Sequence, residues 1–253
     1  MSQAQVRELL AAHDFRRKVK NHVMRAVLLV AAFIAIAPLV SVFVYVIHQG
    51  FPALSVEFFT QLPKPVGESG GGMANAMLGS LIMIVLAALV GIPAGIAGGV
   101  YLSEYGTGKL AHALRFSIDM LASIPSIIVG LFAYAMIVLP MKRFSALAGG
   151  LALAIIMIPT VARTTEELLK LVPIHLREAG LALGIPRWKV TVRVVLRGAL
   201  GGIMTGVMLA VARAGGETAP LLFTALNSQF WFKGLDQPVA SLPVQIYNYA
   251  ISP

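Results

Sequence analysis

The stretch GALGGIMTGVMLAVARAGGETAPLLFTAL, residues 198–226, is apolar along most of its length and carries only two charged side chains, Arg213 and Glu217. A run of about 20 apolar residues is long enough to cross a bilayer as a helix. The remaining sequence agrees, because 58% of the 253 residues are hydrophobic, 12% are charged and the mean hydropathy is +0.83. Soluble domains carry about 25% charged residues. The sequence therefore predicts an all-α polytopic membrane protein.

Five segments are long and apolar enough to predict transmembrane spans. They cover residues 24–47, 75–101, 117–139, 146–162 and 198–222. Prolines in these spans, such as Pro125, are expected to kink the helices, since neighbouring helices can satisfy the freed carbonyls. Glycines recur every fourth residue in the second and fifth spans, which favours close helix packing over a pore lining. These glycines are Gly91, Gly95, Gly99, Gly198, Gly202 and Gly206.

Basic residues indicate the orientation of the chain. The N-terminal segment and residues 163–197 are rich in Lys and Arg, whereas the loop 48–73 carries only Lys64. Cytoplasmic loops carry an excess of positive charge, so the N-terminus and residues 163–197 are expected in the cytoplasm. Lys142 and Arg143 lie on the expected outer side and run against the rule. The net charge of +9 thus belongs to loops between spans, and no nucleic-acid partner is expected.

The chain is expected to have two parts. Residues 1–72 would form a basic cytoplasmic N-terminus, an uncleaved first span and an outer loop, and residues 73–253 would form the permease core. Within the core, Glu104 and Asp119 are expected at the membrane interface.

The cytoplasmic segment 163–197 has helical patterns too short to span. Thr164 and Glu167 have the spacing of a capping box, which predicts that a short helix begins there. A second short helix is expected over residues 174–183, closed by Gly184. Its apolar stripe has a small centre, which fits a helix lying on lipid headgroups as well as a helix seated against a protein. The stripe consists of Leu176, Ala179, Gly180 and Leu183.

Arg213 and Glu217 would share one face of a continuous fifth span, where each can partly neutralise the other. A charge at the bilayer centre costs about 2.5–3.5 kcal/mol on insertion scales. Pairing rarely makes two charges better than two apolar residues. We therefore expect the pair to line a water-filled path, where the guanidinium fork suits a phosphate-like oxyanion. The alternative is an internal salt bridge that fixes the span against a neighbour.

The stretch EAGLALGIPRWKVTVRVVL, residues 178–196, resembles the EAA loop of ABC-transporter membrane subunits. The matching residues are Glu178, Ala179, Gly180, Gly184, Val194 and Leu196, whereas Arg197 stands where that family usually has proline. The resemblance implies a type I ABC importer transmembrane domain with a cytoplasmic coupling helix. It also implies that Glu178, Ala179, Gly180 and Gly184 dock on a partner ATPase.

Three other stretches resemble the PstA-type permeases of phosphate ABC importers. They are GGGMANAMLGSLIMIVLA (70–87), GGETAPLLFTAL (215–226) and LPVQIYNYA (242–250). The resemblance implies a sister permease of PstC type, an ATPase dimer of PstB type and an outer phosphate-binding protein. It places the chain in the bacterial inner membrane and Arg213 and Glu217 in the translocation path for phosphate. The family finishes with a sixth span where this sequence ends, so either the sequence is truncated, which we expect, or the protein has lost that helix.

No residue pattern points to catalysis, a metal site or a cofactor. The chain has no cysteine, its histidines are scattered, and GTGKL at 106–110 lacks the phosphate-binding spacing, so ATP hydrolysis is expected in a partner. Three alternatives stay open. These are a permease for molybdate, sulfate or phosphonate, a secondary transporter in which Glu217 carries a proton, and a non-transporting scaffold.

Overall fold

The computed structural model describes residues 3–65, 68 and 70–251, with side chains from residue 16 onward. The described residues form helices and loops and no strand, so the predicted all-α class is confirmed. The chain divides into two compact units, Met1–Val56 and Glu57–Pro253.

The first unit consists of one long helix, α1 (Gln3–Gly50), followed by the short turn η1 (Phe51–Ala53). Its apolar part, Arg16–Ala53, satisfies the length and hydropathy of a span, and none of its most apolar window is buried. Pro38 lies inside the helix without ending it. Large apolar side chains such as Phe33 are exposed over its whole circumference, as expected for a helix surrounded by lipid.

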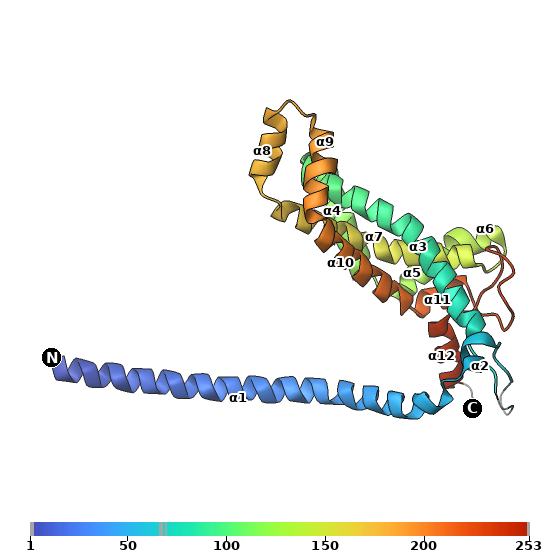
Figure 1. The fold of residues 1–253 in the computed structure, drawn as a ribbon, viewed down its shortest axis with the longest axis horizontal. Coiled ribbons are helices and arrows are strands. Elements are labelled where there is room, and N and C mark those ends of the chain that lie inside the picture. Colours follow the sequence, from blue (N-terminus) through green and yellow to red (C-terminus); the bar gives the residue numbers. More distant parts are fainter. Residues whose placement is uncertain (1–2, 66–67, 69, 252–253) are drawn as a thin grey trace. The chain divides into compact units, whose positions relative to one another are not determined.

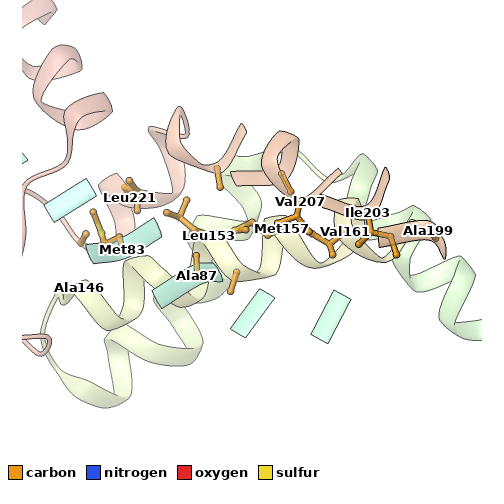
Figure 2. Packing of buried hydrophobic residues seen from close by; sticks show 14 of the residues in the cluster. Met83, Ala87, Ala146, Leu153, Met157, Val161, Ala199, Ile203, Val207 and Leu221 are labelled. Atoms are coloured by element: carbon orange, nitrogen blue, oxygen red, sulfur yellow. The ribbon is translucent and has the colours of Figure 1, made fainter. Parts of the chain in front are cut away.

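The second unit is built around α7 (Ala146–Leu171), against which α3 (Ala74–Val100) and α10 (Leu196–Gly215) both pack. In α7, 67% of the most apolar window is buried, compared with 22% for the span containing α3 and 33% for the span containing α10, so α7 is the central helix. Figure 2 shows the buried side chains as a row that follows α7, including Met83 of α3, Met157 of α7 and Ile203 of α10.

Close packing of these helices depends on small residues. A Cβ atom added at Gly95 would lie 2.6 Å from Cβ of Val161, and one at Gly99 would lie 2.6 Å from the carbonyl oxygen of Ala162. The predicted glycine contacts are confirmed for Gly91, Gly95, Gly99, Gly202 and Gly206. Gly198 is the exception, because a Cβ there would meet only Val172 at 4.0 Å.

The predicted third span is broken. It consists of α4 (Gly108–Ser123) and of α5 (Ser126–Ala133) with η3 (Tyr134–Val138) and α6 (Leu139–Met141), and the two halves meet at 106°. The cause is Pro125, which has no backbone N–H and disfavours helical geometry at Ile124, whose ψ is 133°. The described residues thus contain four helices that are long and apolar enough to span a membrane, or five if this bent pair is one span.

The expected capping box at Thr164 and Glu167 is wrong. No helix begins there, because α7 continues without interruption to Leu171. Its N-cap is Ser145, whose Oγ accepts a 3.1 Å hydrogen bond from the Ala148 amide. Val161, Thr165 and Leu169 are all buried, so the packed face of α7 extends beyond the predicted end of the fourth span. Tertiary packing therefore outweighs the local capping signal.

The remaining helices lie at the two ends of the second unit (Figure 1). One end carries α8 (Ile174–Ala182) and α9 (Arg187–Val190), and η4 (Thr191–Val195) joins α9 to α10. The opposite end carries α6, α11 (Ala219–Thr224) and α12 (Leu242–Ile251). The short helix α2 (Val56–Thr60) leads into the second unit.

Candidate functional site

Helix α8 confirms the short helix predicted over 174–183. It follows Pro173, ends at Ala182 and is closed by Gly184, which adopts the left-handed conformation with φ of +73°. The Gly184 amide donates to Leu181 O at 2.9 Å and the Ile185 amide donates to Gly180 O at 3.2 Å. This pattern is a Schellman motif, for which glycine is the favoured residue. The turn that closes α8 therefore depends directly on Gly184.

The apolar stripe of α8 does not form a single exposed face. Leu176 and Leu183 are 46% and 79% exposed, whereas Gly180 is buried against α9. A Cβ atom on Gly180 would lie 2.8 Å from Cγ2 of Val190. The small centre of the stripe thus accommodates a residue of the same chain. Glu178, Ala179 and Gly184 remain exposed, so they form the part of the predicted docking surface that is accessible.

A buried ion pair attaches α8 to the end of α3. The Glu104 side chain is 5% exposed and the Arg177 side chain 20% exposed, and Arg177 Nη2 donates to Glu104 Oε1 at 2.7 Å. Glu104 is therefore buried beneath α8 and is not accessible at the surface of the protein. Asp119 is exposed and pairs with Arg163 at 3.2 Å.

Glu166 forms a second buried carboxylate site nearby, on α7. Its side chain is 3% exposed and accepts a 2.8 Å hydrogen bond from Arg115 Nε and a 2.6 Å hydrogen bond from Lys170 Nζ. Arg115 also donates to Leu102 O at 2.8 Å. Neither arginine partner could be predicted from the sequence, because Arg177 lies 73 residues from Glu104 and Arg115 lies 51 residues from Glu166, each on another helix.

Arg213 and Glu217 do not lie inside one continuous helix, so the prediction of a charged pair within the fifth span is corrected. Helix α10 ends at Gly215, and α11 begins at Ala219. Gly215 and Gly216 favour helix poorly, and Pro220 is suited to the first turn of a new helix. The turn between the helices includes a 3.1 Å hydrogen bond from the Gly216 amide to Arg213 O.

The two side chains are still neighbours across this turn. Arg213 Nε lies 4.0 Å from Glu217 Oε1, and the side chains are 53% and 16% exposed. Arg213 lies on a face of α10 that the second unit does not cover, together with Met208 (69% exposed) and Leu209 (66%). The guanidinium is therefore held loosely at the end of an uncovered apolar face.

Arg143, one of the two basic residues that run against the orientation rule, has an acidic partner at the end of the second unit that carries α6. Arg143 Nη1 pairs with Asp236 Oδ2 at 2.7 Å, and both side chains are about half exposed. Among the described residues, no three His, Cys, Asp or Glu side chains are grouped as metal ligands.

Comparison with known proteins gives the chain's family. Residues 91–239 match the family model of the binding-protein-dependent transport system inner membrane component. The chain is 44% identical to the phosphate transport system permease protein PstA of Yersinia pestis, over 94% of this chain and 81% of that protein. It is 46% identical to the PstA of Pasteurella multocida, over 95% of this chain and 86% of that protein. The chain belongs to the PstA permease family.

The fold is also similar to that of a solved permease. An inward-facing structure of the MetNI methionine ABC transporter aligns with a TM-score of 0.55 and 20% identity, covering 70% of this chain and 77% of that chain. The predicted fold class, a type I ABC importer transmembrane domain, is confirmed. This member of the PstA family is thus a multi-pass membrane permease subunit of an ABC transporter, which also contains an ATPase and another permease.

Proposed function

We propose that this chain is the membrane-spanning permease subunit of an ATP-driven importer that moves inorganic phosphate into the cytoplasm. The names of its PstA relatives support phosphate as the substrate. The structural observation that carries the proposal is the loosely held Arg213, half exposed on an uncovered face of α10.

Arg213 has the chemistry to bind a phosphate oxyanion in transit. Its guanidinium donates no hydrogen bond to the part of the chain that the structure describes, and its ion pair with Glu217 is long at 4.0 Å. A guanidinium fork matches two oxygens of phosphate. In this proposal Glu217 holds Arg213 while the path is empty and releases it when an anion arrives. Both residues thereby belong to the translocation path.

In this proposal, ATP hydrolysis acts on the end of the second unit that carries α8, opposite the end near Arg213. We place α8 as the coupling helix, with Glu178, Ala179 and Gly184 facing a PstB-type ATPase dimer and Gly180 keeping α8 against α9. A PstC-type sister permease covers the open face of α10, and an outer phosphate-binding protein delivers phosphate. The N-terminus lies in the cytoplasm and the membrane is the bacterial inner membrane. Residues 73–253 form the permease core, preceded by the part formed by residues 1–72.

Phosphate uptake in cells that lack their own PstA protein tests this function. The wild-type chain, Arg213→Gln and Arg143→Gln are expressed at equal levels, and uptake of labelled phosphate is measured with and without a protonophore. We expect ATP-dependent uptake that survives collapse of the proton gradient, is lost in Arg213→Gln and is retained in Arg143→Gln. Uptake abolished by the protonophore while ATP remains would instead favour proton coupling through Glu217.

Competition identifies the oxyanion. Unlabelled phosphate should displace the label, whereas molybdate, sulfate and phosphonate at the same concentration should not. Displacement by one of these anions at lower concentration than phosphate would reassign the substrate.

A further inference from the structure

We infer that the buried Glu104–Arg177 pair is a mechanical joint through which displacement of α8 reaches the end of α3. The two residues are positioning residues, and the inference rests on the proposed function. The observation that supports the inference is that the Arg177 side chain binds several helices at once.

Arg177 connects three elements through its guanidinium. Nε donates to both Glu104 oxygens, at 3.1 and 3.2 Å, and Nη2 donates to Oε1 at 2.7 Å. Nη2 also donates to Leu169 O at 2.8 Å, and Nη1 donates to Val172 O at 2.6 Å, at the end of α7. A planar fork with this many partners has little freedom to rotate. A shift of α8 is therefore transferred to the ends of both α3 and α7.

The end of α3 is suited to receive such a shift. Its span ends in a single π-helical turn, η2 (Tyr101–Tyr105), whose carbonyls are not satisfied by a further helical turn. Arginines from two other elements bind these carbonyls. Arg115 of α4 donates to Leu102 O, and Arg187 of α9 donates to Glu104 O and also lies 5.0 Å from the centre of the Tyr105 ring. The turn is thus held from α4, α8 and α9 together.

Helix α8 has few other attachments. Its principal backbone neighbours are α9 and η4, which precede α10. Gly180 is its buried residue, and Ile174, Leu176 and Leu181 are 46–61% exposed. The routes from α8 to α10 and to α7 are therefore along the chain, with Val172 and Pro173 joining α7 to α8, whereas the direct route to α3 runs through Arg177. Loss of the pair should remove this direct connection between α8 and α3.

Reconstitution of the whole transporter in liposomes tests the joint. Phosphate uptake and ATP hydrolysis are measured in the same sample, and the ratio of phosphate imported to ATP hydrolysed is the readout. The wild-type complex must first import phosphate with ATP, and failure at that step contradicts the proposed function itself. A variant that merely loosens the fold would lower assembly, measured as co-purified ATPase, without changing the ratio in the assembled fraction.

The double variant Glu104→Leu/Arg177→Met removes the joint and leaves no charge buried and unpaired. Proteins often tolerate replacement of both partners of a buried ion pair by apolar residues, whereas removal of one partner is strongly destabilising. We expect normal co-purification of the ATPase and a fall in the ratio of roughly 2- to 30-fold, the range typical of residues that couple two sites. The control is Arg143→Gln/Asp236→Asn, which removes an exposed pair of the same 2.7 Å length at the other end. An unchanged ratio in the double variant would overturn the inference.

Two further variants test the joint if the Glu104→Leu/Arg177→Met protein does not assemble with the ATPase. Arg177→Lys keeps the charge beside Glu104, but a single ammonium cannot reproduce the fork, so the ratio should still fall. The chain has no cysteine, so Glu104→Cys/Arg177→Cys can be joined selectively with a short bifunctional thiol reagent. Cross-linking should restore the ratio towards that of the wild type. A wild-type ratio in Arg177→Lys, or no recovery on cross-linking, would contradict the joint.

Discussion

Arg213 Nε lies 4.0 Å from Glu217 Oε1 across the turn that separates α10 from α11. Because the helix ends between the two residues, their separation is set by a glycine-containing turn and not by the fixed geometry of one helix. The turn places a weakly engaged guanidinium beside a carboxylate that is mostly buried. An oxyanion can therefore compete for the cation without having to break a tight salt bridge.

Arg213→Gln should abolish most phosphate uptake while the protein remains folded. Each hydrogen bond from a charged group is worth about 1.5–3 kcal/mol, so loss of the guanidinium should lower uptake by about tenfold or more. The 4.0 Å ion pair itself contributes less than about 1 kcal/mol to stability, because the Arg213 side chain is half exposed. Glu217→Gln should cause a smaller fall, since the guanidinium remains. Initial uptake rates at matched membrane levels check this, and normal rates in both variants would remove the pair from the path.

Gly180→Val should weaken binding of the ATPase. The added side chain would collide with Val190, where even a Cβ atom would lie 2.8 Å from Cγ2, so α8 must move away from α9. Co-purification of the ATPase measures this effect, and equal recovery with Gly180→Val and wild type would exclude a role for the α8–α9 contact.

Gly99→Ala should destabilise the protein, whereas Gly98→Ala on the same helix should not. A Cβ at Gly99 would lie 2.6 Å from Ala162 O, and overpacking of this kind costs about 1–3 kcal/mol. At Gly98 the nearest atom would be Ala162 Cβ at 3.8 Å, and alanine favours helix by about 0.5–1 kcal/mol over glycine. Thermal unfolding in detergent measures the difference. Similar Tm values for the two variants would contradict the close α3–α7 packing.

Ser145→Ala should lower stability by about 1 kcal/mol, because Ser145 Oγ caps the first turn of the central helix α7. Ser117→Ala is the control, since Ser117 Oγ only donates to the Ala113 carbonyl of its own helix on an exposed face. The Tm in detergent should fall for the first variant and stay within error for the second. A shift in the control as large as that of Ser145→Ala would mean that the cap is not the cause.

Four of the five predicted spans overlap helices that can span a membrane, because the length and hydropathy of a bilayer-crossing segment are local properties of the sequence. The bend at Pro125 could not be distinguished in this way from a tolerated kink. A proline is compatible with a kinked helix or with a complete break. The packing of the second half, α5, against α7 and α11 decides which of the two the chain adopts. The same reasoning applies at Gly215, where flexible residues permitted a kink but the structure has a complete break.

The candidate site was predicted only in part. The helix that contains Glu178 and is closed by Gly184 followed from local signals of helix termination. The burial of Gly180 and the partners of Glu104 did not, because each depends on contacts between elements distant in sequence. Carboxylates near the ends of apolar segments are the available signal, since burial of such a group demands a cationic partner. That signal does not identify which arginine is the partner.

The most direct test of the account is the rate of ATP hydrolysis by the purified complex of this chain, its sister permease and the ATPase, in the presence of the phosphate-binding protein. We predict that phosphate stimulates hydrolysis more than sulfate, molybdate or phosphonate does, and that Arg213→Gln abolishes the import that accompanies it. Hydrolysis that responds to another oxyanion but not to phosphate, or full import with Arg213→Gln, would contradict the account.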